Sequence, residues 1–146
     1  MERNTDLSIF IVDDDPLCRE MYKQYLKNMG YTNVRLYDDG QQCVNDLTQM
    51  PDIIFLDHEM KPITGLETLK KIKRFNPDIF MVYISAQEDM QVAINALKYG
   101  AFDYIIKGQQ DEEKITSIML RIADVMELIS EKTAPKWKKI LSLLTF

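Results

Sequence analysis

The sequence predicts an α/β protein built on a doubly wound, five-stranded parallel sheet. Short, β-branched apolar runs alternate with segments of helical periodicity from one end of the chain to the other. One run, Ile79–Ile84, is apolar at almost every position, which is typical of a strand covered by helices on both faces. Two other runs end directly on acids, at Asp13 and Asp57. Ligands of such sheets bind beyond the carboxyl ends of the strands, so these acids mark the region to examine for function.

Each strand is predicted from a short apolar run bounded by turn-forming or polar residues. In chain order, the runs are Leu7–Val12, Val34–Tyr37, Ile53–Leu56, Ile79–Ile84 and Tyr104–Ile106. Their alternation with helices requires crossover connections, and these make the sheet parallel.

The first two helices are predicted from their start signals and apolar spacing. Pro16–Met29 has proline near its first turn and an apolar face, and Gly30 ends it. The sequence Asp38-Asp39-Gly40 introduces a second helix that is expected to run to about Met50.

The remaining helices follow the third, fourth and fifth strands. Gly65–Phe75 carries leucine and isoleucine at helical spacing, and Asn76-Pro77-Asp78 stops it. Met90–Tyr99 is closed by Gly100, and Asp111–Ser130 shows one long apolar stripe.

The composition is that of an ordinary soluble domain of 146 residues, 46% apolar and 28% charged. A net charge of −5 does not attract nucleic acid or anionic membrane, so direct nucleic-acid binding is not expected. We expect no membrane span and a cytoplasmic location, since no apolar run approaches ~20 residues and the N-terminus lacks a signal-peptide core. Cys18 and Cys43 are predicted to be buried, reduced thiols. With His58 as the only histidine, multi-histidine metal sites are excluded.

The acids at the strand ends predict a metal-assisted phosphate site. Asp13, Asp14 and Asp15 follow the first strand, and Asp57 follows the third. Like charges so close are unfavourable unless a cation neutralises them, and carboxylate oxygens suit Mg²⁺ or Mn²⁺. Asp57 is the candidate nucleophile because a carboxylate needs no general base. At other strand ends, Lys107 and Ser85 offer a positive charge and a hydroxyl to phosphate oxygens.

Four motifs on these strand ends resemble the receiver domain of two-component response regulators, of the kind that acts in chemotaxis. They are Val12-Asp13-Asp14-Asp15-Pro16, Asp57 with Met60 and Gly65 after it, Ser85-Ala86, and Gly100-Ala101-Phe102-Asp103-Tyr104-Ile105-Ile106-Lys107. The resemblance covers about Leu7 to Ile129 and implies a flavodoxin-like (βα)5 fold with strand order 2-1-3-4-5. It also implies a receiver domain over residues 1–130.

The resemblance assigns a role to each site residue. Asp57 would be the phospho-acceptor and, like Asp14, a ligand of the ion. Asp13 would act largely through water, and the third protein contact to the ion would be the main-chain carbonyl of Glu59. Lys107 would pair with the phosphoryl oxygens. Two further residues are implied as the switch: the hydroxyl of Ser85 and the aromatic ring of Tyr104.

The resemblance also implies partners. The phosphoryl group would come from a sensor histidine kinase or a histidine phosphotransfer protein. The signal would leave through the face made by the fourth helix, fifth strand and fifth helix, about Met90 to Ser130, which would bind a downstream protein or a second copy of the chain. Alternatively, the signal would pass to an attached output domain that this sequence does not contain.

The chain departs from the family pattern at three places. The family's proline directly after Met60 is here Lys61-Pro62, and its Lys-Pro is here Lys107-Gly108. We expect a trans bond before Gly108, because a cis bond there would cost about 2.5–4 kcal/mol. Glu59 and Gln87 occupy positions that tune phosphoryl lifetime in the family. Glu59 would repel the phosphoryl group, orient water or pair with Lys107.

Two rival functions fit parts of the pattern. A haloacid-dehalogenase-like phosphatase would use Asp13 as nucleophile and Asp15 as general acid, with Ser85 and Lys107 in support, but it leaves Asp57 without a role. A receiver-like docking module would not be phosphorylated at all.

Residues 131–146 form a predicted tail or linker. Trp137, Ile140, Leu141 and Leu144 share one face at helical spacing. The segment would pack on the domain, dimerise, bind a partner or begin an output module. Membrane-surface binding is a further alternative, although so short a segment more often packs against protein.

Overall fold

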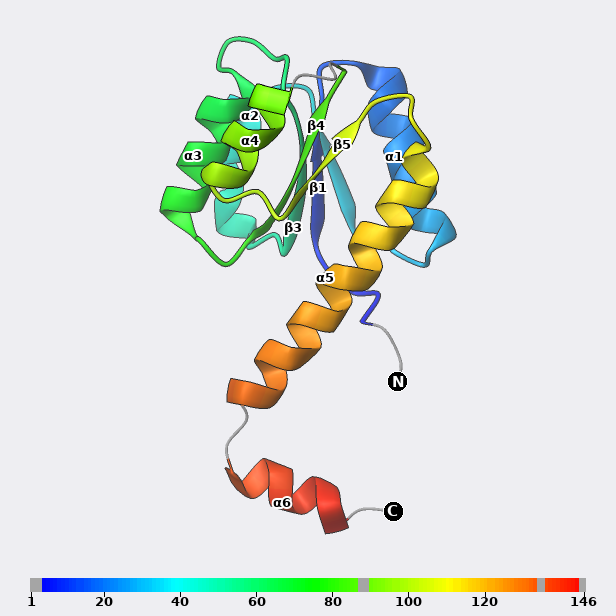
Figure 1. Cartoon of the computed structure of the whole chain (residues 1–146), viewed down its shortest axis with the longest axis vertical. Coiled ribbons are helices and arrows are strands. Elements are labelled where there is room, and N and C mark those ends of the chain that lie inside the picture. The colour runs from blue at the N-terminus through cyan, green and yellow to red at the C-terminus, as the bar shows by residue number, and fades with distance from the viewer. Residues whose placement is uncertain (1–3, 87–89, 134–135, 145–146) are drawn as a thin grey trace.

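The structure, a computed structural model, describes residues 4–86, 90–133 and 136–144. Its centre is a five-stranded sheet in the order β2-β1-β3-β4-β5, with every neighbouring pair parallel (Figure 1). The strands are β1 (Ile9–Val12), β2 (Val34–Tyr37), β3 (Ile53–Asp57), β4 (Phe80–Ser85) and β5 (Asp103–Ile106). The predicted fold class and strand order are therefore confirmed.

Helices cover both faces of the sheet, with α1 and α5 on one side and α2, α3 and α4 on the other (Figure 1). Their bounds are α1 (Pro16–Asn28), α2 (Gly40–Asn45), α3 (Gly65–Phe75), α4 (Met90–Lys98), α5 (Asp111–Thr133) and α6 (Lys136–Leu144). Three of them begin at a capping side chain, because Asp15, Asp39 and Thr64 each accept a hydrogen bond from a main-chain N–H of the first turn.

The second helix is shorter than predicted. It ends at Asn45 and is followed by a 3-10 turn, η1 (Leu47–Gln49), instead of continuing to Met50. The carboxylate of Asp46, at the break, accepts a hydrogen bond from the Tyr37 hydroxyl at 2.9 Å, and Met50 has a left-handed backbone (φ 59°). A tertiary contact and a tight turn before Pro51 thus replace the last helical turn. The fifth helix, in contrast, runs three residues beyond the predicted Ser130.

Side chains alternate along the strands between two buried clusters. Ile9 and Ile11 of β1 face the α1–α5 side, whereas Phe10 and Val12 face the α2–α4 side. All four are fully buried, which explains why the strand has no polar position. The sheet is thus held from both faces, and polar chemistry is left to its ends.

The two cysteines differ. Cys43 is buried as predicted, but Cys18 is only half-buried, contrary to the prediction. The Cys18 thiol lies in the first turn of α1, where it donates to the Asp15 carboxylate at 3.3 Å. Burial, followed by this hydrogen bond, raises the pKa of the Cys18 thiol to about 11.

The C-terminal part of the chain leads away from the carboxyl ends of the strands. Helix α5 runs past the opposite end of the sheet, and α6 follows it (Figure 1). The apolar positions predicted for the tail fall within α6 and remain more than half exposed: Trp137, Ile140, Leu141 and Leu144. Within the described residues, we find no helix with the length and apolar character needed to span a membrane.

Candidate functional site

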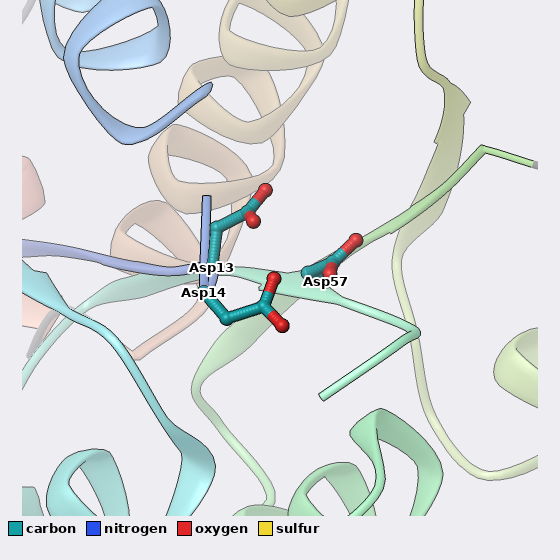
Figure 2. Close-up of side chains that lie close together, drawn as sticks. All are labelled: Asp13, Asp14 and Asp57. Atoms are coloured by element: carbon teal, nitrogen blue, oxygen red, sulfur yellow. The ribbon is translucent and has the colours of Figure 1, made fainter. Parts of the chain in front are cut away.

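Three aspartates meet at the carboxyl end of the sheet. Strands β1 and β3 are paired so that Val12 lies opposite Leu56, which places Asp13 and Asp57 side by side at the next position. One carboxylate oxygen from each of Asp13, Asp14 and Asp57 lies within 4.8 Å of the other two (Figure 2). Asp13 and Asp57 are buried and Asp14 is exposed, so the cluster is open to solvent on one side. The predicted acids are brought together.

Lys107 lies against this cluster. Its Nζ is 3.0 Å from Asp13 Oδ2 and 3.0 Å from Asp57 Oδ1. The main chain sets this position, because the Lys107 N–H donates to the Ser85 carbonyl at 2.9 Å and the chain then turns at Gly108 with a φ of +80°. Within the described residues only Lys61–Pro62 is cis, so the bond before Gly108 is trans as expected.

Negative charges outnumber positive ones at this end of the sheet, and the pKa values of Asp57 and Lys107 are both shifted. Burial, reinforced by the charge of Asp13, raises the pKa of Asp57 to about 6, although Lys107 acts in the opposite direction. Burial by itself would lower the pKa of Lys107, but the hydrogen bonds to Asp13 and Asp57 outweigh it and raise that pKa. Three carboxylates facing one ammonium leave an excess of negative charge. The oxygen-only donor set and this charge fit a hard divalent cation such as Mg²⁺.

Asp13 is held by contacts that the sequence did not reveal. Its Oδ1 accepts the Asp15 N–H at 2.9 Å, and its main-chain carbonyl accepts the Arg19 guanidinium at 2.6 Å. Arg19 lies one turn into α1, and nothing in its spacing distinguishes it from a surface arginine. The result is a buried carboxylate with a fixed orientation beside Asp57.

The other predicted residues lie around this centre. Ser85 is buried at the end of β4, one residue after the partner of Asp57 in the ladder. Tyr104 of β5 is half-buried and packs against the α2–α4 cluster, with the Lys114 Nζ 6.0 Å from its ring centroid. Glu59 is exposed and lines the cavity described below. Gln87 lies outside the described residues.

A cavity of about 780 Å³ opens over the aspartates. Its lining includes Asp14, Asp57, Glu59, Lys61, Thr64 and Lys107. The loop after β3 forms one wall and is closed by Gly65, where an added Cβ would lie 2.3 Å from the Asp57 carbonyl oxygen. Only glycine allows the start of α3 to approach Asp57 so closely.

A hydrogen bond between the side chains of His58 and Tyr83, close to Asp57, was not predicted from the sequence. His58 lines the cavity, and its Nδ1 lies 2.6 Å from the Tyr83 hydroxyl. The register pairs Leu56 with Tyr83, so the strand parity could have indicated that His58 and Tyr83 share a face.

The position of Asp15 argues against the phosphatase alternative. Its carboxylate accepts hydrogen bonds from the Cys18 thiol and the Leu17 N–H, and these lower its pKa. A general acid needs a raised pKa so that it holds a proton near neutral pH. Asp15 is therefore a helix cap.

Comparisons with known proteins agree with this geometry. The family model of the response regulator receiver domain matches residues 9–119. The chain is 36% identical to the transcriptional regulatory protein ZraR of Escherichia coli over 103 residues, which are 70% of this chain and 23% of that protein. It is 29% identical to the DNA-binding transcriptional regulator NtrC of Klebsiella pneumoniae over 127 residues, 86% of this chain and 27% of that one.

Solved structures share the fold. The CheX-CheY-BeF3-Mg²⁺ complex of Borrelia burgdorferi matches with a TM-score of 0.74 at 24% identity, covering 80% of this chain and 88% of that one. The chain spans about a quarter of the length of ZraR and NtrC, so the activities of those whole proteins are not transferred with the match. The family match covers most of the chain and coincides with the acidic site. The chain therefore belongs to the response regulator receiver domain family.

Proposed function

We propose that this chain is a phosphorylation-dependent signalling switch that accepts a phosphoryl group on Asp57. One observation carries the proposal: the Lys107 ammonium lies 3.0 Å from both Asp57 and Asp13, beside the third carboxylate of Asp14. The arrangement offers a nucleophile, a positive charge for phosphoryl oxygens and acids for an ion within one open cavity. Membership of the receiver family supports the same function.

Asp57 is suited to attack phosphorus. With a pKa of about 6, its carboxylate is mostly ionised at pH 7.5 and needs no base. One Asp57 oxygen forms a bond to phosphorus while the bond from phosphorus to the donor nitrogen or oxygen breaks, and the leaving group keeps that electron pair. The Lys107 ammonium would pair with an oxygen of the transferred phosphoryl group, since the flexible lysine stem lets the charge move with that oxygen. The Ser85 hydroxyl would donate a hydrogen bond to a second phosphoryl oxygen.

The two acids that follow β1, together with Asp57 at the end of β3, would hold Mg²⁺ or Mn²⁺. Asp14 and Asp57 would be direct ligands, Asp13 would act largely through water, and Glu59 would contribute its main-chain carbonyl. A bound divalent ion neutralises phosphate oxygens during transfer. The BeF3 and Mg²⁺ named in the complex of the similar CheY support a phosphate-like and metal-binding site here.

The donor would be a sensor histidine kinase or a histidine phosphotransfer protein. The response would be a change of affinity at the face formed by α4, β5 and α5, with Ser85 and Tyr104 as the moving residues. Large apolar side chains on α4 are exposed on this part of the molecule: Met90, Ile94 and Leu97. They support contact with a downstream protein or with a second copy of the chain. Residues 1–130 would form the receiver and residues 131–146 a tail or linker.

The test is intact mass after incubation with acetyl phosphate and Mg²⁺. Wild type should gain one labile phosphoryl group, and Asp57→Asn should gain none. Asp124→Asn, an exposed acid on α5, is the matched control and should behave as wild type. The adduct should also disappear when EDTA replaces Mg²⁺.

Absence of an adduct in wild type would contradict the proposal and favour a docking module that is not phosphorylated. Slow loss of the adduct without turnover of added phosphomonoesters would agree with a switch that catalyses only its own phosphorylation and dephosphorylation. For Glu59, the expected outcome is a changed adduct half-life in Glu59→Asn, and an unchanged one would remove its rate-tuning role.

A further inference from the structure

The residue directly after Asp57 makes a short side-chain hydrogen bond. His58 Nδ1 and the Tyr83 hydroxyl are 2.6 Å apart, and the two rings meet edge to face with centroids 5.6 Å apart. Tyr83 is 1% exposed and belongs to the α2–α4 core. A short hydrogen bond to such a rigid partner fixes the orientation of His58.

His58 is also fixed through its main chain. Its N–H donates to the Ile84 carbonyl at 2.7 Å, and its carbonyl accepts the Gly65 N–H at 3.1 Å. An added Cβ on Gly65 would be 2.8 Å from the His58 Cα and 2.8 Å from the Tyr83 hydroxyl. The His58 main chain, the Tyr83 phenol and the start of α3 therefore pack closely together.

This arrangement determines where Glu59 lies. Glu59 is exposed and lines the cavity, but its neighbours on both sides are anchored: His58 to Tyr83, and Met60, 5% exposed, in the α2–α4 core. The main chain of Glu59 is therefore held on both sides, by His58 and by Met60, at the edge of the acidic cluster.

We propose that His58 is a positioning residue. Its hydrogen bond with Tyr83 would hold the main chain of Glu59 so that the Glu59 carbonyl oxygen can coordinate the ion. The inference rests on the proposed function, because it assumes that the ion binds at Asp14 and Asp57. It adds a residue outside the set proposed to bind the ion and the phosphoryl group. Partners that orient metal ligands in this way commonly change metal affinity by about tenfold or more.

The test compares four variants. Tyr83→Phe and His58→Leu remove the hydrogen bond. His58→Asn keeps it, because the asparagine amide lies close to the place of Nδ1 and can donate or accept. Tyr37→Phe is the matched control, since it removes a 2.9 Å tyrosine–Asp46 hydrogen bond in the same core cluster but on β2.

Two quantities are measured for each variant. The Mg²⁺ dissociation constant of the unphosphorylated protein comes from amide shifts in an NMR titration, and the free energy of unfolding comes from urea denaturation in EDTA. We expect the dissociation constant to rise about tenfold in Tyr83→Phe and His58→Leu. It should change less than twofold in His58→Asn and Tyr37→Phe, although Tyr37→Phe should lose as much stability as Tyr83→Phe.

The outcomes separate this inference from the proposed function. An unchanged Mg²⁺ dissociation constant in Tyr83→Phe, with wild type still phosphorylated on Asp57, would overturn the role of His58 alone. Equal weakening of Mg²⁺ binding in Tyr37→Phe would also overturn it, because general loosening of the core would then suffice. A wild type that neither binds Mg²⁺ nor forms the adduct would overturn both.

Discussion

Two half-buried lysines lie at opposite ends of the sheet, and their pKa values are shifted in opposite directions. Lys107, at the carboxyl ends of the strands, contacts the carboxylates of Asp13 and Asp57, and its pKa is raised. Lys73, at the other end, donates to the main-chain carbonyls of Pro77 at 2.9 Å and Ile79 at 2.7 Å. Burial lowers the pKa of Lys73, because neutral carbonyls compensate less for lost water than carboxylates do.

The difference separates function from structure within one fold. At the Lys73 end, charged groups satisfy main-chain groups where the chain enters a strand; the Asp52 carboxylate, for example, accepts the Ser8 N–H at 2.8 Å. At the Lys107 end, charges face one another and remain unbalanced. Burying Asp13 and Asp57 side by side is unfavourable for stability alone, so the imbalance marks this end of the sheet as the candidate ligand-binding end.

The largest expected contrast comes from one glycine at each end. Gly65→Ala should lower the free energy of unfolding by about 3 kcal/mol, because its Cβ would overlap the Asp57 carbonyl, which is main chain and cannot rotate away. Gly100→Ala should cost about 1–2 kcal/mol, mainly because φ is +109°. There the neighbouring atoms are the flexible Lys73 methylenes. Urea denaturation measures both, and equal losses would contradict the difference in packing.

The next contrast exchanges the two lysines for methionine. Lys107→Met should slow phosphorylation by acetyl phosphate about tenfold to a hundredfold, because a preorganised charge beside the phosphoryl oxygens is lost. Lys73→Met should leave the rate within about twofold of wild type. Rates come from intact mass against time at saturating Mg²⁺. A normal rate in Lys107→Met would remove the lysine from the proposed mechanism.

Much of this organisation could be predicted from the sequence, and the part that could not has a physical reason. The grouping of Asp13, Asp57 and Lys107 could be predicted, because all three lie at or just after the carboxyl ends of strands, and these ends meet at one edge of a parallel sheet. The hydrogen bond between His58 and Tyr83 depends on the register of β3 against β4, which has to be known before strand parity can place the two side chains on one face. The contact of Tyr37 with Asp46, which accompanies the early end of α2, is likewise a tertiary contact.

A smaller effect on the free energy of unfolding should follow from removing one negative charge at the Lys107 end of the sheet. In EDTA at pH 7.5, Asp57→Asn should raise the free energy of unfolding by about 1–2 kcal/mol. The folded-state pKa of Asp57, about 6, lies above the ordinary value of 3.8, so its ionised form is disfavoured in the folded protein. That cost is fully present above about pH 6 and disappears as the pH falls below about 4. The advantage of Asp57→Asn should therefore shrink over that range in urea denaturation, and a constant advantage would contradict the assignment. Asp124→Asn is the control and should show no such change.

The smallest effect belongs to the structural lysine. Lys73→Met keeps most of the side-chain stem but leaves the Pro77 and Ile79 carbonyls without the ammonium, at a cost of about 1 kcal/mol per hydrogen bond. The lowered pKa shows that burying this charge is itself unfavourable, so part of that cost is recovered and a net loss of about 1 kcal/mol is expected. Lys71→Met, on the exposed side of α3, should lose less than 0.5 kcal/mol, which is usual for a surface change. If Lys73→Met were as stable as Lys71→Met, hydrogen bonding to the two carbonyls would be worth no more than solvation by water, and Lys73 would not support the entry of β4. A loss confined to Lys73, with normal phosphorylation, would show that each end of the sheet can be altered without the other.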